Sequence, residues 1–275
     1  MCCDSFWGRQ VRTGLSRGIE HLEIEHDGAR LASLANKWLA ARERSHPQKP
    51  LFLWMHILEP HNWSSGVGEM RSDADRKRMY DRSLVRSDAM VGELLRAFSD
   101  RPVDRAPIII VTADHGEGLG EHGHPTHSTD LYNAQIRIPL VVTGPGITPR
   151  TVPESVSLTD LVPTILELAG YAAPTGPSIE GNSFADLATG ARPGNPEGGI
   201  AFAAMIKDRS NPGGITAIVK GRWKLIDNND NLELYDVRSD PGEHNNVLGQ
   251  KPQILEELRK LLAERAAAAD ISPFD

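Results

Sequence analysis

One segment, residues 114–127, holds most of the side chains in this sequence that could do chemistry. It reads Asp-His-Gly-Glu-Gly-Leu-Gly-Glu-His-Gly-His-Pro-Thr-His and concentrates one Asp, two Glu, four His and four Gly. Carboxylates and imidazoles are ligands of divalent ions of intermediate hardness, and glycines let a backbone turn tightly around such an ion. The segment is therefore a candidate metal site. The alternative is a polar loop in which an Asp-His pair caps a strand by hydrogen bonds.

Two short apolar runs lead into the candidate chemistry, at residues 51–58 and 108–112. Continuous apolar runs of this length are typical of strands buried on both faces. His61, in Glu59-Pro60-His61, follows the first run, and Asp114 and His115 follow the second. Open α/β sheets bind ligands beyond the carboxyl ends of their strands. The sequence therefore predicts these three side chains at one edge of a sheet.

The rest of the chain carries helix and strand patterns that complete an α/β fold. Helical periodicity predicts helices over about residues 28–44, 73–99 and 159–170, and residues 138–142 predict another strand. After a loop rich in Pro and Gly at 172–199, strands are expected at 200–206 and 215–219, then a hairpin with strands at 223–226 and 232–236, and a final amphipathic helix spanning residues 254–262.

These elements predict a three-layer α/β sandwich with a mostly parallel central sheet, plus a smaller antiparallel sheet with a helix at the carboxyl end. The expected main domain covers residues 1–199, and the expected terminal subdomain covers residues 200–275.

Composition excludes several classes of partner. The 275 residues carry a formal net charge of −7, with basic and acidic residues interspersed, so we expect no binding to nucleic acid. No apolar stretch approaches the roughly 20 residues of a membrane-spanning helix. Cys2 and Cys3 are adjacent and cannot link distant parts of the fold. The first residues lack a signal-peptide pattern, and neither the localisation nor the oligomeric state can be read from the sequence.

Five further motifs follow residues 114–127 along the chain. They are Ile136-Arg137-Ile138-Pro139-Leu140, Asp160-Leu161-Val162-Pro163-Thr164, Trp223-Lys224-Leu225-Ile226, Glu233-Leu234-Tyr235-Asp236 and Asp240-Pro241-Gly242-Glu243. Together with Glu59-Pro60-His61 and the His-rich segment, they resemble the sulfatase family of the alkaline phosphatase superfamily. The resemblance covers about residues 25–265.

The resemblance implies a role for each of four residues. Asp114 and His115 would be two ligands of one divalent metal ion, with Ca²⁺ the usual ion of the family and Mn²⁺ or Mg²⁺ the alternatives. His61 and His127 would contact the sulfate or phosphate group, and His127 could also protonate the leaving alcohol. The alternatives are a cap after the strand for His61 and a loop histidine bonded to a nearby carbonyl for His127.

The nucleophile of the family is not found in this sequence. Sulfatases make a formylglycine from a Cys or Ser in a Cys/Ser-x-Pro-x-Arg element, and no such element occurs between residues 1 and 275. The nearest segment, Ser45-His46-Pro47-Gln48-Lys49, has Lys in place of Arg. The pair of Asp ligands that the family carries on its first strand is also missing. We therefore expect a chain without its amino-terminal segment, either a fragment of a longer enzyme or one that a partner completes.

The resemblance implies hydrolysis of sulfate esters, with a small-molecule or carbohydrate sulfate ester as substrate. A phosphodiesterase or phosphonate monoester hydrolase of the same superfamily is the first alternative, because the visible motifs are shared. A non-catalytic sulfatase-like module is the second. The substrate alcohol would contact loops such as 62–70 and 172–199, whose composition identifies no particular sugar, steroid or lipid.

Overall fold

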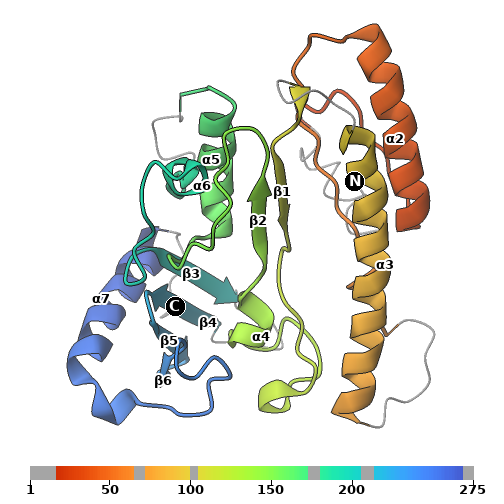
Figure 1. Cartoon of the computed structure of the whole chain (residues 1–275). Coiled ribbons are helices and arrows are strands. Elements are labelled where there is room, and N and C mark those ends of the chain that lie inside the picture. Colours follow the sequence, from red (N-terminus) through yellow and green to blue (C-terminus); the bar gives the residue numbers. More distant parts are fainter. Residues whose placement is uncertain (1–16, 65–71, 100–104, 173–179, 206–213, 269–275) are drawn as a thin grey trace. The chain divides into compact units, whose positions relative to one another are not determined.

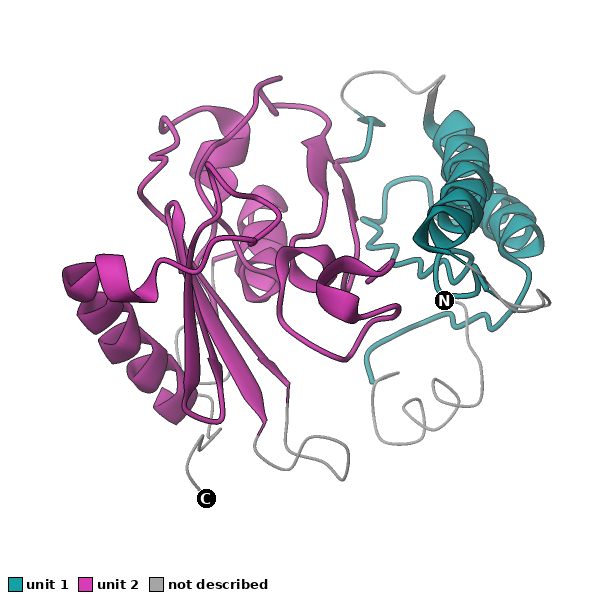
Figure 2. Cartoon of the chain, turned by 90° about the horizontal axis from the view of Figure 1, so that it is seen from below, with its two compact units in different colours: residues 1–107 teal, residues 108–275 magenta. Residues whose placement is uncertain are grey.

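The computed structural model describes residues 17–64, 72–99, 105–172, 180–205 and 214–268. The chain divides into two compact units, residues 1–107 and residues 108–275 (Figure 2). The predicted domain boundary near residue 199 stays a prediction, and Cys2 and Cys3 lie outside the described residues. No described helix combines the length and the apolar character that crossing a membrane requires.

Unit 1 contains two long helices, α2 (Gly28–Ser45) and α3 (Asp73–Ser99), which lie side by side (Figure 1). Both confirm the predicted helical ranges. The Asp27 carboxylate caps α2 by accepting a hydrogen bond from the Arg30 amide at 2.9 Å. The Asn36 side chain donates to the Glu93 carbonyl oxygen at 3.3 Å and so joins the two helices.

The apolar run at residues 51–58 does not form the buried strand that we predicted. None of these residues is in a strand, and the Phe52 side chain is 71% exposed. A short continuous apolar run carries no periodicity of its own, so the pattern cannot decide its structure. A strand also needs a neighbour for its backbone hydrogen bonds, and no described strand pairs with this run.

Unit 2 begins with a two-stranded sheet made of β1 (Ile109–Thr112) and β2 (Leu140–Thr143). The strands confirm two predicted ranges, but they run antiparallel, with Thr112 opposite Leu140. The mostly parallel central sheet that we predicted is therefore not confirmed among the described residues. The long connection between β1 and β2 lets the chain reverse, and antiparallel pairing needs no crossover helix. This connection contains the His-rich segment.

The remaining short helices of unit 2 lie in its connections. They are the 3₁₀ turn η3 (Glu121–Gly123), α4 (Asn133–Ile136), the 3₁₀ turn η4 (Leu158–Asp160), α5 (Leu161–Leu168), α6 (Ala185–Thr189) and the 3₁₀ turn η5 (Leu248–Gln250). The helix predicted at 159–170 corresponds to η4 followed by α5. Ser157 and Asp160 form a capping box at the start of η4.

The second sheet of unit 2 is an antiparallel meander of four strands in sequence order, β3 (Ile200–Met205), β4 (Ile215–Lys220), β5 (Trp223–Asn228) and β6 (Asn231–Asp236). Asn229 and Asp230 connect β5 to β6 with φ angles of 53° and 65°. Two successive positive φ values suit a tight hairpin turn, because they match the twist of the strands. The helix α7 (Pro252–Ala268) follows, and the predicted terminal sheet with its helix is confirmed.

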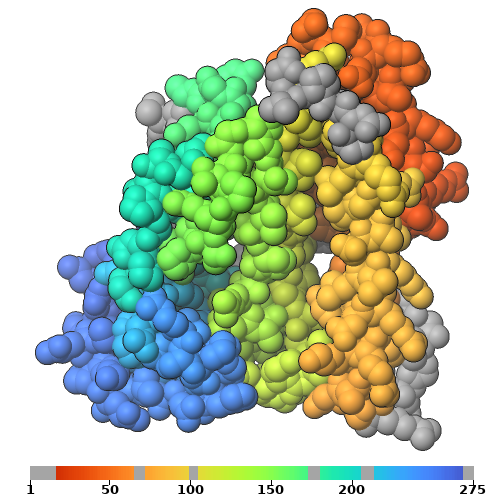
Figure 3. Space-filling model, in the orientation of Figure 1, coloured from red at the N-terminus to blue at the C-terminus, as the bar shows by residue number. Residues whose placement is uncertain are grey.

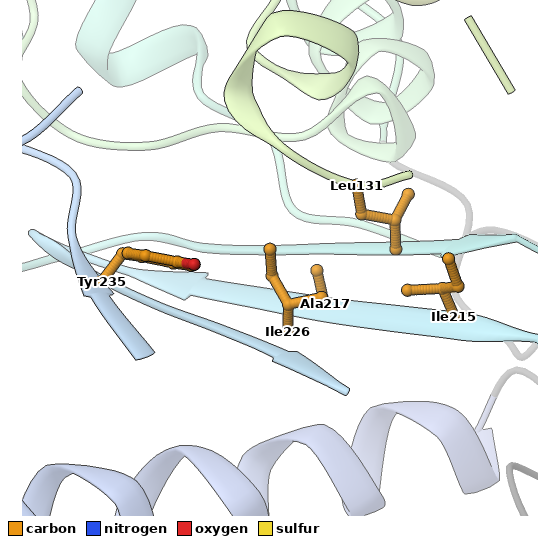
Figure 4. Close-up of a cluster of buried hydrophobic side chains, with 5 residues drawn as sticks. All are labelled: Leu131, Ile215, Ala217, Ile226 and Tyr235. Carbon is orange, nitrogen blue, oxygen red and sulfur yellow. The ribbon is translucent and has the colours of Figure 1, made fainter. Parts of the chain in front are cut away.

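Both faces of the four-stranded sheet are covered. On one face, Ile218, Leu225 and Leu234 pack against Leu258 and Leu262 of α7. On the other face lies a cluster of Leu131, Ile215, Ala217, Ile226 and Tyr235, drawn in Figure 4 with α7 beyond the opposite side of the sheet. Because Leu131 belongs to the β1–β2 connection, this second cluster anchors the His-rich segment to the sheet.

Candidate functional site

Close backbone contacts shape the β1–β2 connection at two glycines. The Gly116 amide donates to the Gln135 carbonyl oxygen at 2.7 Å, and a Cβ at position 116 would lie 2.1 Å from the Ala134 carbonyl oxygen. A Cβ at Gly118 would lie 2.6 Å from the His124 carbonyl oxygen. Only glycine allows such close approach of backbone to backbone. These residues therefore define the path of the segment that carries the candidate ligands.

A buried side-chain network braces the segment after His127. Asp130 Oδ1 accepts a hydrogen bond from the Tyr132 amide at 2.8 Å, and its Oδ2 accepts one from Gln135 Nε2 at 2.6 Å. Gln135 also donates to Thr129 Oγ1 at 2.7 Å. Both Asp130 and Gln135 are buried, so these bonds are shielded from competition by water. These bonds hold α4 against the residues that follow the His-rich segment.

His115 and His127 lie next to each other although twelve residues separate them in sequence. Their ring centroids are 4.5 Å apart, and ligand nitrogens of the two rings lie within 4.8 Å of one another. His115 Nδ1 is 2.7 Å from the Gly116 carbonyl oxygen, which can only accept a hydrogen bond. Nδ1 must therefore carry the hydrogen, and in the neutral ring Nε2 has the lone pair that a metal ligand needs.

Glu117 is the partner of His127. Its Oε2 lies 2.9 Å from His127 Nδ1, and the Glu117 side chain is buried. An ionised carboxylate accepts hydrogen bonds only, so it fixes the tautomer and the orientation of the ring, and His127 Nε2 becomes the atom that can exchange a proton. Glu117 Oε1 is also buried and has no hydrogen-bond partner among the described residues.

The donor set at the start of the segment fits a divalent ion. Asp114 is exposed, and its Oδ2 lies 4.0 Å from His115 Nε2. Ligand atoms that lie about 2.0–2.6 Å from one ion can be separated by this distance. Asp114 Oδ1 accepts a hydrogen bond from the His115 amide at 3.0 Å, which ties the two candidate ligands together. One carboxylate oxygen and one imidazole nitrogen are thus available at the same place.

His61 belongs to unit 1, where it is exposed at the end of the 51–60 segment. Its neighbour Glu59 has a structural contact: Oε1 accepts a hydrogen bond from the Gly28 amide at 2.7 Å, at the amino terminus of α2. A carboxylate at that end of a helix is stabilised by the helix dipole. The role predicted for His61 stays a prediction. His56, within the apolar run at residues 51–58, is half-buried.

The other two histidines of the segment contact protein groups. His122 stacks on Tyr132 with ring centroids 3.6 Å apart, and its Nε2 lies 2.9 Å from the Gly242 carbonyl oxygen. His124 Nε2 lies 3.8 Å from Asp130 Oδ2. His122 adopts a φ of 52°, which is uncommon for a residue with a Cβ. Both histidines serve the packing of the loop.

Sequence reasoning missed the role of Glu117. Glu117 lies two residues after His115 in the sequence. Nothing in the neighbouring residues indicates that its side chain is buried or that it contacts His127. A buried Glu surrounded by glycines is a weak signal in a sequence, since most glutamates are exposed. The contact between Glu117 and His127 depends on the tertiary fold of the β1–β2 connection.

Two family models match this chain. The family model "Sulfatase" matches residues 4–171, which is more than half of the chain. The model "N-sulphoglucosamine sulphohydrolase, C-terminal" matches residues 120–268. The two matches together extend from the first helices through the four-stranded sheet to α7.

Individual proteins are similar as well. Arylsulfatase K of Mus musculus is 31% identical over 212 residues, which cover 72% of this chain and 38% of the relative. Delta 4,5-hexuronate-2-O-sulfatase of Bacteroides thetaiotaomicron is 30% identical over 186 residues, which cover 66% of this chain and 37% of the relative. A solved structure described as a 2-O GAG sulfatase is 26% identical with a TM-score of 0.60, and the match covers 72% of this chain and 44% of that one.

The chain spans less than half the length of the curated relatives named above. Within that span, the family match includes every residue of the Asp114–His127 segment, and the fold of the chain is similar to that of sulfatase structures. The chain belongs to the sulfatase family.

Proposed function

We propose that this chain forms the metal-binding and proton-transferring part of a sulfuric ester hydrolase. The observation that carries the proposal is the approach of His127, held by the buried Glu117, to His115 beside Asp114. Hydrolysis of a sulfate ester needs positive charge near the sulfate oxygens and a proton for the leaving alcohol. These residues could provide both.

Asp114 and His115 would hold the divalent ion. We propose Ca²⁺, the usual ion of the family, with Mn²⁺ and Mg²⁺ as the alternatives, because a carboxylate such as that of Asp114 suits all three ions. When bound, such an ion polarises the sulfate group and stabilises the charge that develops on its oxygens. The hydrogen bond from His115 Nδ1 to the Gly116 carbonyl keeps Nε2 directed to this role.

His127 would supply the proton. With Nδ1 bound to Glu117, the protonated ring can donate from Nε2 to the oxygen of the leaving alcohol, and Glu117 stabilises the charged ring meanwhile. His61 would make a second contact with the sulfate group, as the Glu59-Pro60-His61 motif implies. No residue between 1 and 275 stands in the nucleophile motif of the family. We therefore propose that the chain works as part of a longer or partner-completed enzyme.

The names of two similar proteins suggest a substrate class. One is a hexuronate-2-O-sulfatase and another is a 2-O GAG sulfatase. We propose that a uronic acid sulfated at the 2-O position, at the end of a glycosaminoglycan fragment, is the first carbohydrate to test. Loop 62–70, of which residues 65–70 lie outside the described residues, is one of the segments expected to contact the sugar.

The experiment measures sulfate release from a 2-O-sulfated hexuronate disaccharide, with an aryl sulfate and an aryl phosphodiester for comparison. The 275-residue chain and a form extended upstream in its reading frame are each tested with EDTA, Ca²⁺ or Mn²⁺. We expect metal-dependent release of sulfate by the extended form. Preferential cleavage of the phosphodiester would favour the phosphoryl-transfer alternative, and inactivity of both forms on every ester would favour a non-catalytic module.

The variant that tests the proton donor is His127→Gln in the active form. We expect kcat to fall by about 10²–10⁴, the usual contribution of a general acid. His46→Gln is the matched control, because His46 is an exposed histidine at the end of α2 in unit 1. An equal loss in both variants, or no loss in His127→Gln, would remove His127 from the mechanism.

A further inference from the structure

A charged pair lies buried between the four-stranded sheet and the β1–β2 connection. Lys224 of β5 and Glu243, which follows β6, have side chains that are 0% and 1% exposed, and Lys224 Nζ lies 2.5 Å from Glu243 Oε1. Burial lowers the pKa of the Lys224 ammonium group, although the Glu243 carboxylate opposes this effect. Removing two charges from water costs several kcal/mol for each ion, so a buried pair is a weak source of stability.

The same two side chains hold the beginning of α4. Glu243 Oε2 accepts a hydrogen bond from the Asn133 amide at 2.5 Å, and Lys224 Nζ donates to Asn133 Oδ1 at 3.3 Å. Asn133 Nδ2 in turn donates to the Pro241 carbonyl oxygen at 3.0 Å. Asn133 is the first residue of α4, so its amide would otherwise have no partner in the helix. The buried pair thus fixes the start of α4 to the sheet.

The helix α4 is also in direct contact with the candidate site. The Gln135 carbonyl oxygen accepts the hydrogen bond of the Gly116 amide, and the Gly116 carbonyl oxygen accepts that of His115 Nδ1. A continuous set of contacts therefore runs from Glu243 through Asn133 and α4 to Gly116 and the ring of His115. Every step in it is a hydrogen bond or a covalent connection.

A second set of hydrogen bonds also joins the β1–β2 connection to the four-stranded sheet. The phenol groups of Tyr132 and Tyr235 both donate to Glu233 Oε2, at 2.7 and 2.6 Å. Burial and the Glu233 carboxylate raise the pKa of both tyrosines, so both remain donors. The residue next to Asn133 is thus held independently, and loss of the Lys224–Glu243 pair should loosen α4 without detaching the loop.

We propose that Lys224 and Glu243 are positioning residues, which set the place of Gly116 and His115 through Asn133 and α4. The consequence for catalysis rests on the proposed function, whereas the consequence for the loop does not. The Glu243 carboxylate has two oxygens with separate partners: one is paired with the Lys224 ammonium group, and the other accepts the hydrogen bond of the Asn133 amide.

Two neutral double variants isolate this role. Lys224→Met with Glu243→Gln keeps a side-chain oxygen that can accept from the Asn133 amide, whereas Lys224→Met with Glu243→Met removes it. Both avoid the unpaired buried charge that a single substitution would leave and that could by itself unfold the protein. Lys220→Met is the control, because it breaks the exposed Lys220–Glu257 pair between β4 and α7.

The first measurement is amide hydrogen exchange in the 275-residue chain. We expect the Gly116 amide to exchange about tenfold faster in the Met/Met variant than in the Met/Gln variant, with the amides of β4 and α7 equal in the two. Lys220→Met should leave Gly116 unchanged. Equal exchange of Gly116 in both double variants, or faster exchange throughout unit 2 in Met/Met alone, would overturn the proposal.

The second measurement is kinetics of the extended form on a sulfate ester. We expect kcat to be about tenfold lower in the Met/Met variant than in the Met/Gln variant, with KM unchanged. The reason is that the candidate metal ligand His115 is displaced while the substrate contacts remain. A change in KM alone would overturn the catalytic part. If the unsubstituted extended form is inactive while the exchange difference at Gly116 persists, the proposed function fails and the positioning of the loop stands.

Discussion

Unit 2 contains two sheets that differ in how completely they are covered. In the four-stranded sheet, Leu225 and Leu234 are fully buried between the strands and α7. In the two-stranded sheet, the Val141 side chain of β2 is 56% exposed, and the segment around β2 is visible at the surface in green (Figure 3). The exposed sheet is not the more polar one, because β1 and β2 contain no charged residue, whereas β5 and β6 contain several.

The difference shows that an apolar strand pattern predicts a strand but not its burial. Strands β3–β6 follow one another with short connections, so each strand finds its neighbour locally, and α7 then covers one face. Strands β1 and β2 are separated by a long connection, and Leu131 of this connection packs against the other sheet. The stability of unit 2 should therefore depend mainly on the four-stranded sheet.

The largest expected effect tests that statement directly. Leu225→Ala should lower the free energy of unfolding by about 3 kcal/mol, because it removes buried methyl groups and leaves a cavity. Val141→Ala, the matched change in the two-stranded sheet, should cost less than about 1 kcal/mol, since most of its side chain is already in water. Urea denaturation of both variants checks this, and equal losses would show that the two sheets contribute alike.

A smaller effect is expected at Gly116, in the connection between β1 and β2. Gly116→Ala should cost roughly 1–3 kcal/mol, because the added Cβ would collide with the backbone of Ala134, which must move. Gly92→Ala in α3 is the control: its Cβ meets no atom within 4 Å, and alanine favours helices by up to about 1 kcal/mol. Thermal unfolding of both variants distinguishes a tightly packed connection from a loose one, for which both changes would be harmless.

The smallest effect concerns acid. The Arg222 guanidinium beside Asp236 lowers the pKa of that carboxyl to about 2, from an ordinary value of 3.8. A lowered carboxyl pKa stabilises the fold above pH 3.8, and this stability is lost as the pH falls through 2. Asp236→Asn should therefore weaken the protein at pH 6 but make unfolding less steep between pH 4 and pH 2. An unchanged acid transition in the variant would show that this pair contributes nothing to the four-stranded sheet.

Most elements with clear local signals could be predicted from the sequence. The ranges of α2, α3, α7 and strands β3–β6 follow from helical or strand periodicity, and the turn at Asn229 and Asp230 follows from residues that tolerate positive φ. The run at residues 51–58 could not be predicted in the same way, since hydrophobicity without periodicity does not specify a partner.

The candidate site was predictable in part for the same reason. The Asp114-His115 pair and the spacing to His127 are visible in the motif. The closeness of His115 and His127, and the bond from Glu117 to His127, depend on how the connection turns at Gly116 and Gly118.

The sequence by itself determined the family, the elements with strong periodicity and the segment in which chemistry is concentrated, because motif order and local backbone preferences are properties of neighbouring residues. Only the tertiary structure decided that β1 and β2 pair antiparallel and that Lys224 is buried against Glu243 beside Asn133. Strand pairing and the burial of polar groups depend on contacts between residues that are far apart in the chain. No pattern of neighbouring residues specifies those contacts.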